Sequence, residues 1–496
     1  MLNIIFDLDG TLWNTEKSYY YAFKKFIENN PNKASQMKID VVQKLKAITM
    51  DKMAPLLFPL DSDEDRYNNM LECLKYSCEY LIQYEQIDQK KIDHIIELSK
   101  HFNLYIVSNC PFEYINIFFE KTKLRSYFKD VIALGGFTVN NDFDKSNNLL
   151  NLVERENLIK NETFFVGDSS LDLQASEFAK VNFIYLNEQM DILSTIYQKI
   201  ENQKILSLCD YYKEYIYEDA SVVLMINKKQ KEYQNLFSFL NLSKNNDINN
   251  TLFKMMEEDA KAKGLTKIVG PINYSTWFDY RLPIDNFDVS FIPDIKGCKE
   301  EVDFLYSRGY QNLYTYASTL ATINQRLEFV TKRNKLSSEY YDELVVGEKV
   351  FDYTKEIFAL SSLCFTNGYL YSDVPYDVFD SIYMKWLKKL PFSIDLYMIR
   401  EKETKVLIAY GICYYDTLNK MYVCKTAAIH PEHQKTNVVM QLAKIVFERT
   451  RHHQASQVLY HFQNEQKNTL SAFWRGCVLL KKRYALFIKE LNNETM

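Results

Sequence analysis

The chain begins with an apolar run of strand length, Asn3–Phe6, that ends in acidic residues. Similar apolar runs recur four times, separated by segments with helical spacing, at residues 104–107, 131–134, 163–166 and 182–186. Short apolar runs bounded by polar residues are typical of buried strands. Their alternation with helices predicts a parallel sheet covered by helices on both faces. We therefore expect residues 1–198 to form an α/β domain.

Residues 14–98 interrupt this alternation with helical segments only. Apolar positions recur at helical spacing, as in Leu71, Leu74, Cys78 and Leu81. The expected helices are Tyr19–Ile27, Val41–Ala47, Asp63–Ile82 and Lys90–His101. This pattern predicts a helical insertion after the first strand, either a cap that closes over a site or a purely structural subdomain.

Polar residues follow three of the expected strands, and a lysine precedes a helix. Asp7 and Asp9 lie one residue apart, so their side chains point to the same side of an extended backbone. The others are Ser108, Asn109, Lys145, Asp168 and Asp172. Ligands of open α/β sheets bind at the carboxyl ends of the strands. Two acids that flank one residue also occur in calcium loops and solvated turns. The prediction of a ligand site at this edge of the sheet therefore depends on the whole set of residues.

The order of an Asp pair, Ser, Lys and a second acid pair resembles the haloacid dehalogenase (HAD) superfamily, in its phosphoglycolate-phosphatase-like and phosphoglucomutase-like branch. The resemblance covers about residues 1–198, with all four family motifs in order. It implies a Rossmann-like domain with a helical cap at about 14–98. It also implies Mg²⁺-dependent hydrolysis of a small phosphorylated metabolite. A degenerate domain that binds without turnover is the alternative.

The same resemblance implies a role for each polar residue. Asp7 is the expected nucleophile, which forms an aspartyl-phosphate, and Asp9 is the expected general acid and base. Lys145 is expected to neutralise charge. The phosphate group is expected to bind at Gly10, Thr11, Ser108 and Asn109. The Mg²⁺ ligands are expected to be Asp7, Asp9 through its carbonyl, Asp168 and Asp172, since hard cations take oxygen ligands.

The remainder of the chain mixes strands and helices in a different order. Residues 199–345 show a strand at 220–226, a helix at 250–263, the string Gly270–Trp277 and a short helix that ends at Gly309. Before them, Ser194–Tyr217 is expected to be a helical connector. Residues 346–496 show two helices, a hairpin at 394–415, a strand to Ile429, the helix Val438–Thr450 and two more strands.

This order resembles GNAT-type acyltransferases, degenerate over 199–345 and more complete over 346–496. The expected fold class is thus α/β, a Rossmann-like HAD domain followed by two GNAT-like α+β domains. GNAT enzymes bind the pyrophosphate of an acyl-CoA, such as acetyl-CoA, on a loop at a helix N-terminus. That loop reads Q/R-x-x-G-x-G/A, and here it is Gln434, Lys435, Thr436, Asn437, Val438 and Val439. Asn437 and Val439 replace small residues, which leaves acyl-CoA binding open.

Other candidates in this part have equally good structural explanations. Tyr484 lies where GNAT enzymes often place a general acid, and a core tyrosine fits as well. Trp277 and Tyr280 are candidates for an acceptor pocket or for aromatic core. Asn464 and Asn468 follow a strand, where they also suit a helix cap. Glu432 is a candidate base that also fits a turn. His430, His433, His452 and His453 show no metal-ligand spacing, so we expect them at the surface or at helix ends.

Composition narrows the class of protein. The net charge of −5 indicates no nucleic-acid-binding surface. Nine cysteines without a C-x-x-C pair favour reduced thiols in a cytoplasmic protein. No apolar run approaches the ~18 residues that span a bilayer, and Asp7 interrupts the first strand, unlike a signal peptide. No feature of the sequence indicates an oligomeric state.

Three hypotheses follow for the whole chain. The first is a bifunctional enzyme, an HAD phosphatase joined to a GNAT acyltransferase. The second keeps the phosphatase and makes the GNAT-like part a non-catalytic binding or dimerisation module. The third is acyl transfer from an acyl carrier protein, which ranks last because that group usually has Asn at the position of Gly10.

Overall fold

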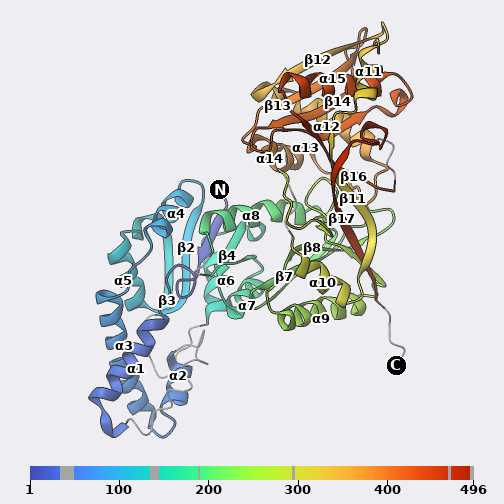
Figure 1. Cartoon of the computed structure of the whole chain (residues 1–496). Helices are drawn as coiled ribbons and strands as arrows, with labels where there is room; N and C mark the ends of the chain where they lie inside the picture. The colour runs from blue at the N-terminus through green and yellow to red at the C-terminus, as the bar shows by residue number, and fades with distance from the viewer. Residues whose placement is uncertain (34–49, 135–143, 188–189, 293–296, 467–470, 492–496) are drawn as a thin grey trace. The chain divides into compact units, whose positions relative to one another are not determined.

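The computed structural model describes all residues except 34–49, 135–143, 188–189, 293–296, 467–470 and 492–496. The chain divides into two compact units, residues 1–200 and 201–496 (Figure 1). The helix expected at Val41–Ala47 and the candidate Asn468 lie outside the described residues. In the described part, no helix is both long enough and apolar enough to cross a bilayer.

The first unit is built on a parallel sheet whose strand order is β3-β2-β1-β4-β5. The strands are β1 (Asn3–Phe6), β2 (Asn103–Pro111), β3 (Phe128–Leu134), β4 (Thr163–Gly167) and β5 (Asn182–Tyr185). All four residues of the central β1 are buried, as expected for a strand covered on both faces. The parallel α/β sheet predicted from the apolar runs, and the Rossmann-like fold implied by the resemblance, are confirmed.

Helices alternate with these strands after a helical insertion. The insertion comprises α1 (Glu16–Asn29), α2 (Met50–Leu57) and α3 (Asp63–Gln83). Ser77 of α3 donates a 2.6 Å hydrogen bond to Ser18 of α1, and both small side chains are buried. The next helix, α4 (Gln89–Ser99), packs against β2 of the sheet. Then come α5 (Phe112–Thr122), α6 (Lys145–Arg155), α7 (Ser170–Ala179) and α8 (Ile192–Leu206).

The second unit is organised around one mostly antiparallel sheet of order β12-β13-β14-β15-β16-β11-β17-β9-β8-β7-β6, with β10 paired to β17. The strands of its first half are β6 (Tyr211–Tyr217), β7 (Ala220–Ile226), β8 (Asn235–Asn241), β9 (Lys267–Gly270), β10 (Leu282–Pro283) and β11 (Gln311–Thr322). Those of its second half are β12 (Tyr340–Val346), β13 (Ile394–Glu401), β14 (Leu407–Asp416), β15 (Met421–Ile429), β16 (Gln457–Asn464) and β17 (Val478–Glu490). The helices are α9 (Asn246–Ala262), α10 (Lys299–Ser307), α11 (Gln325–Lys332), α12 (Thr354–Phe365), α13 (Tyr376–Val378), α14 (Lys385–Lys388) and α15 (Val438–His452).

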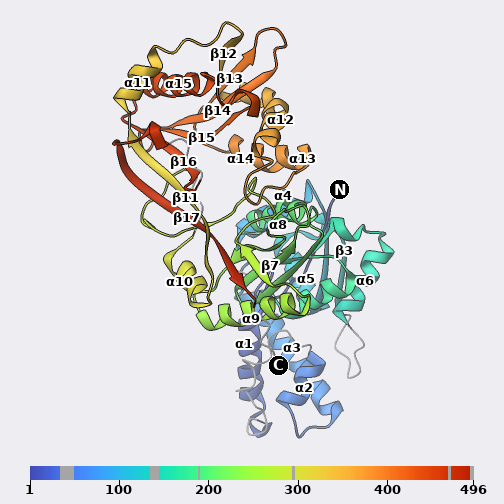
Figure 2. The same ribbon diagram turned by 90° about the vertical axis from the view of Figure 1, so that its right-hand side faces the viewer.

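The two halves of this sheet repeat one pattern. In each half a helix connects two parallel neighbours, α9 between β8 and β9 and α15 between β15 and β16. The last strand of each half is exchanged, because β11 pairs with β16 and β17 pairs with β9. The exchanged strands pair with each other at the centre of the sheet and run side by side in Figures 1 and 2. This topology indicates an internal repeat and fits the two GNAT-like α+β domains expected from the sequence.

The predicted connector Ser194–Tyr217 is partly wrong. Helix α8 ends at Leu206, and Tyr211–Tyr217 forms β6, which pairs with β7 along its whole length. The run Tyr-Tyr-Lys-Glu-Tyr-Ile-Tyr is rich in aromatic and branched residues, which favour strands. The helical spacing of this segment was misleading, because pairing with β7 determined its secondary structure. One of the two helices expected at the start of residues 346–496 is irregular, since its segment Phe379–Met384 is π-helical.

Candidate active site

The strand ends of the first unit bring the predicted polar residues to one edge of the sheet. Asp7 follows the central β1, Ser108 lies in the neighbouring β2, and Asp168 follows β4 on the other side. Lys145 is the first residue of α6 and Asp172 lies in the first turn of α7. Carboxylate oxygens of Asp7, Asp168 and Asp172 lie within 4.8 Å of one another.

Lys145 is the cation at the centre of this group. Its Nζ lies 2.6 Å from Asp172 Oδ1 and 3.1 Å from Asp7 Oδ1, and the side chain is buried. Asp172 is held from its other oxygen, which accepts hydrogen bonds from the Ser169 hydroxyl and backbone N–H at the start of α7. This capping box fixes Asp172, so that Asp172 in turn orients Lys145 toward Asp7.

Asp9 points away from this cluster, toward the helical insertion. Its Oδ1 accepts hydrogen bonds from the Thr15 hydroxyl at 2.6 Å and from the Thr15 N–H at 3.1 Å. The hydroxyl of Tyr19, in α1, lies 3.3 Å from Asp9 Oδ2. Asp7 and Asp9 thus occupy different surroundings, one beside a buried lysine and one among neutral donors. A small apolar cavity lined by α1, α2, α3 and Tyr114 also reaches Tyr19.

Two glycines allow the acidic side chains to pack this closely. Gly10 has a φ of 81°, and a Cβ at this position would overlap the carboxylate of Asp168. A Cβ at Gly167 would overlap the side chain of Asp172. Only a residue without a side chain suits the left-handed backbone and the close approach at Gly10.

Three residues predicted to hold a phosphate line the same edge. Ser108 is buried, and its Oγ accepts the N–H of Cys110 at 3.2 Å. The buried Thr11 Oγ1 and Asn109 Oδ1 have no hydrogen-bond partner among the described residues. Buried polar atoms normally have partners, so these atoms suit a polar ligand.

Burial and mutual repulsion disturb the titration of the acids. Burial, opposed by Lys145 and reinforced by Asp172, raises the pKa of Asp7 to about 6. Burial and the charges of Asp7 and Asp172 raise the pKa of Asp168 to about 7. Burial also raises the pKa of Asp9, against the hydrogen bonds from Thr15. Burial alone would lower the pKa of Lys145, but Asp172 and Asp7 outweigh it and raise that pKa.

The donor set at this edge fits a hard divalent cation. Asp7, Asp168 and Asp172 offer carboxylate oxygens, the ligand type that Mg²⁺ prefers. Asp7 Oδ1 is buried and, despite the nearby lysine, accepts no well-directed hydrogen bond from a described residue. Asp9 contributes no side chain to the group.

In the second unit, β15 and β16 separate at a bulge. Their parallel register runs from Met421–Gln457 to Cys424–Tyr460, although the strands continue to Ile429 and Asn464. Register shifts lie at the same level in both strands, beside Lys425 and at His461–Phe462. Phe462 has a φ of 47°. Bulges that re-aim strands occur often beside active sites.

The segment predicted to bind acyl-CoA, 434–439, leads into α15, of which Val438 and Val439 are the first two residues. The side chain of Val438 is buried in a cluster with Ile399 and Ile408, so it does not face a ligand. Asn437 donates a 2.5 Å hydrogen bond to the carbonyl of Lys335. Tyr484 is fully buried in β17, with its ring edge-on to Phe462 at 5.0 Å.

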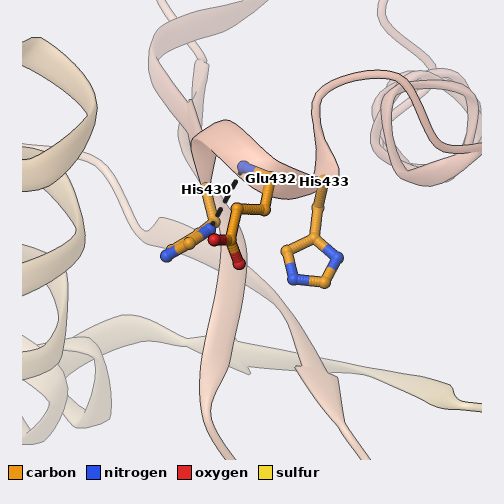
Figure 3. A group of neighbouring side chains, drawn as sticks. All are labelled: His430, Glu432 and His433. Carbon is orange, nitrogen blue, oxygen red and sulfur yellow. Dashed lines mark hydrogen bonds between the residues drawn. The ribbon is translucent and has the colours of Figure 1, made fainter.

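The sequence reading missed one group of possible ligands beside this loop. His430, Glu432 and His433 place one ligand atom each within 4.8 Å of the others (Figure 3). His430 Nδ1 accepts the Glu432 N–H at 3.4 Å, and His433 Nδ1 lies 3.0 Å from the Tyr340 hydroxyl. An imidazole that accepts at Nδ1 carries its proton on Nε2 when neutral, so in this arrangement neither nitrogen of His430 offers a free lone pair. The signal in the sequence was the close spacing of the three residues.

Comparison with known proteins gives one family match. Residues 4–186 match the family model described as haloacid dehalogenase-like hydrolase, and no curated protein matches the chain. A haloacid dehalogenase-like hydrolase from Streptococcus pneumoniae aligns at 16% identity and a TM-score of 0.31, over 39% of this chain and 90% of its own.

Two further solved structures are similar to parts of the chain. A putative phosphoglycolate phosphatase from Lactobacillus plantarum aligns at 18% identity and a TM-score of 0.33, over 40% of this chain and 91% of its own. A tandem GNAT protein from the clavulanic acid biosynthesis pathway aligns at 12% identity and a TM-score of 0.35, over 60% of this chain and 89% of its own. The family match and the parallel sheet with its acidic edge agree: the N-terminal unit of this chain is a haloacid dehalogenase-like hydrolase domain.

Proposed function

We propose that the first unit is a phosphatase that hydrolyses a small phosphate monoester through an aspartyl-phosphate on Asp7. The observation that carries this proposal is the position of Asp7 at the end of the central strand, 3.1 Å from a buried lysine and beside Asp168. A nucleophilic carboxylate must meet an anionic phosphate, and nearby cations offset their repulsion. A bound Mg²⁺, held by Asp7, Asp168 and the Asp9 carbonyl with support from Asp172, would supply most of that compensation.

The chain's own residues account for both steps. An Asp7 oxygen attacks phosphorus, the Asp7–phosphorus bond forms, and the bond from phosphorus to the ester oxygen breaks. Asp9, whose pKa is raised by burial, gives its proton to the departing oxygen. Asp9 then takes a proton from water, the water oxygen attacks phosphorus, and the Asp7–phosphorus bond breaks to release inorganic phosphate. Lys145 holds Asp7 in place, and Ser108, Thr11 and Asn109 contact the phosphate oxygens.

The helical insertion is proposed to act as a cap that selects the substrate. Tyr19 of α1 contacts Asp9, so movement of the insertion changes the surroundings of the general acid. Closure excludes water other than the attacking molecule. A screen for phosphate release from a panel of phosphorylated metabolites tests the proposal. Two results would contradict the proposal. One is release of phosphate in excess chelator without added metal. The other is no release of phosphate from any metabolite of the panel in the presence of Mg²⁺.

Mg²⁺ binding is expected to weaken as pH falls. Metal binds the deprotonated carboxylates, whose pKa values in the metal-free protein are raised to about 6 for Asp7 and about 7 for Asp168. A raised carboxyl pKa stabilises the fold at low pH, and this contribution is lost as pH rises from about 4 to about 7. The metal-free protein should therefore lose stability over that range, and Mg²⁺ should restore it most above pH 7.

Thermal unfolding with and without Mg²⁺ between pH 5 and 8 measures this effect. Asp168→Asn should flatten the pH dependence of the metal-free protein and reduce the Mg²⁺-dependent rise in Tm. Asp63→Asn, a change at an exposed position in α3, should leave both unchanged. Equal Mg²⁺ stabilisation at pH 5 and pH 8 would show that protons and metal do not compete for these carboxylates.

For the second unit we propose acyl transfer from an acyl-CoA. The pairing of β15 and β16 ends early, and the next α-helix after β15 is α15; this arrangement favours the reaction. Backbone N–H groups at the start of α15 suit a pyrophosphate, and the gap between the strands suits the extended pantetheine arm. Gln434, Lys435, Thr436 and Val439 are the proposed contacts, and Tyr484 remains a candidate general acid. Transfer from an acyl carrier protein would use the same gap.

Acetyl-CoA is expected to bind the full chain with measurable heat in titration calorimetry. Val439→Gly removes the side chain that stands where the family has a small residue, so it should strengthen binding severalfold. Val438→Ala serves as the matched control, because Val438 is buried in the core and its truncation should lower Tm without strengthening binding. No binding at millimolar acetyl-CoA or longer acyl-CoAs would instead favour a non-catalytic binding or dimerisation module.

A further inference from the structure

Two arginines are buried in the described part of the chain, and they differ in their partners. Arg400 donates hydrogen bonds to Glu343 and Glu356. Arg281 is only 3% exposed, and its Nε and Nη1 have no hydrogen-bond acceptor among the described residues. A buried charge is strongly unfavourable unless it is paired and hydrogen-bonded. Arg281 is therefore a cation without its expected anion.

Aromatic rings surround the Arg281 guanidinium. Its Cζ lies 3.7 Å from the ring centroid of Phe462, 3.8 Å from that of Tyr280 and 4.6 Å from that of Tyr316. Cation–π contact offsets part of the cost of burying the charge. However, a guanidinium stacked between rings still points its N–H groups outward in its own plane. The rings therefore fix the guanidinium without satisfying its donors, and this favours a binding role over a purely structural one.

Arg281 lies where the two halves of the second unit meet. Phe462 is in β16, beyond the last residue paired with β15, and Tyr316 is in the exchanged strand β11. On the facing strand, Ala427 is exposed although it lies within the sheet. The pairing of β15 with β16 thus ends next to Phe462, one of the rings that surround Arg281. The backbone φ of Arg281 is 74°. Such a positive φ is rare for a residue with a side chain, and such conformations cluster at functional sites.

We propose that Arg281 is the anchor of an oxyanion-binding subsite in the second unit. The ligand is a small molecule with a carboxylate or a phosphate group, whose oxygens accept hydrogen bonds from the guanidinium N–H donors. The aromatic side chains of Tyr280, Tyr316 and Phe462 position the guanidinium and pack against the apolar part of the ligand. The proposal concerns binding alone and holds whether or not the unit transfers an acyl group.

Thermal unfolding and calorimetry of the full chain test this subsite. The probes are sodium malonate and sodium phosphate in excess chelator, compared with sodium chloride at equal ionic strength. Ten times the Kd of a bound anion should raise Tm by roughly 3 °C. Arg281→Met should abolish this rise and weaken binding about tenfold or more. Because it replaces an unpaired charge with an apolar chain, its Tm in chloride should equal or exceed that of the wild type.

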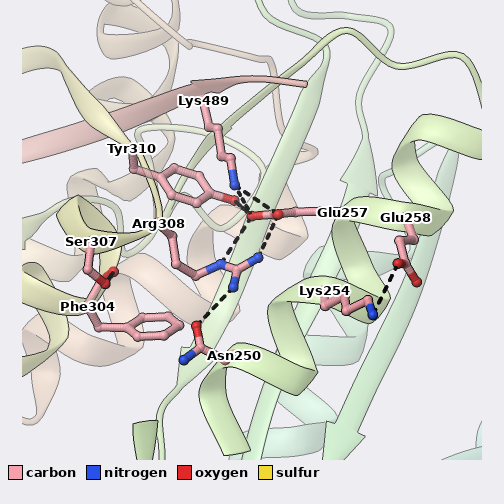
Figure 4. Close-up of polar contacts among 9 residues, drawn as sticks. All are labelled: Asn250, Lys254, Glu257, Glu258, Phe304, Ser307, Arg308, Tyr310 and Lys489. Atoms are coloured by element: carbon pink, nitrogen blue, oxygen red, sulfur yellow. Dashed lines mark hydrogen bonds and ion pairs between the residues drawn. The ribbon is translucent and has the colours of Figure 1, made fainter. Parts of the chain in front are cut away.

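Arg308 provides the matched control. Its guanidinium donates to Glu257 Oε2 at 2.7 Å and to Asn250 at 3.0 Å, and Lys489 and Tyr310 complete the hydrogen bonds to Glu257 (Figure 4). Arg308→Met breaks a satisfied ion pair, so it should lower Tm in every buffer and keep the anion-dependent rise. The two arginines are thus expected to respond in opposite ways.

The outcomes separate the possible ligands. A rise with malonate that Arg281→Met removes identifies a carboxylate subsite, and a rise with phosphate alone that it removes identifies a phosphate subsite. Phosphate bound to the first unit would persist in Arg281→Met, so only the difference between the proteins counts. Arg281→Gln gives the same comparison if Arg281→Met does not fold. Equal shifts in the wild type and both variants, or no shift in any, would overturn the proposal.

Discussion

Asp7→Asn is expected to reduce the rate of release of inorganic phosphate by about a thousandfold or more. When several groups act together in covalent catalysis, removal of one of them abolishes nearly all of the enzyme's activity. The amide has the shape of the carboxylate but no anionic oxygen to attack phosphorus. The rate is measured on whichever phosphomonoester the wild type hydrolyses, with Mg²⁺ in excess. Asp63→Asn, at an exposed position, controls for handling and is expected to keep full activity.

The folding of the Asp7→Asn protein should not suffer. Burial raises the pKa of Asp7 to about 6. The charged carboxylate is therefore less stable in the folded than in the unfolded protein at neutral pH, and it destabilises the fold. The neutral amide of Asn removes this destabilisation. We expect an unchanged or higher Tm together with the loss of turnover. Wild-type turnover in the variant would mean that another group attacks phosphorus. A collapsed Tm would mean that Asp7 is mainly a structural partner of Lys145.

The fold of the first unit and the positions of its acidic residues were largely predictable from the sequence, because both follow local signals. An apolar run that ends in Asp7, and another that ends before Asp168, place both acids at one edge of any parallel sheet. The orientation of Asp9 toward Thr15 was not predictable, since it depends on how the helical insertion leaves β1. Likewise Ser169 and Asp172 have the spacing of a capping box, but only the structure shows that this cap orients Lys145.

The second unit was predicted less well because its sheet depends on contacts distant in sequence. The exchange of β11 and β17 pairs residues near Thr315 with residues near Ala485, and no local pattern specifies such a pairing. Tyr211–Tyr217 became a strand for the same reason. Arg281 would ordinarily be assigned to the surface, and its only signal was the aromatic string Trp277, Phe278 and Tyr280 just before it. A buried arginine without an acidic partner, such as Arg281, can be recognised only when its neighbours in the folded chain are known.

Lys145→Met is expected to destabilise the metal-free first unit by about 3–5 kcal/mol, the usual result of breaking a buried ion pair. Lys145 Nζ lies 2.6 Å from Asp172 and 3.1 Å from Asp7, and without it three carboxylates face one another in a buried space. For a unit of this size the drop in Tm should be roughly 10 °C. Phosphate release should also be lost, since Asp7 is no longer oriented.

The charge balance makes this prediction distinguishable from simple loss of packing. Repulsion among the acids would raise their pKa values further, so the variant should regain stability as pH falls from 7.5 to 5, when they take up protons. Mg²⁺ should raise its Tm more than that of the wild type, because the cation replaces the missing charge. Replacing both partners, in Lys145→Met with Asp172→Asn, should recover much of the lost stability. A variant whose low Tm ignores pH, Mg²⁺ and the second substitution would show that the methylene chain of Lys145, rather than its charge, holds this edge of the sheet together.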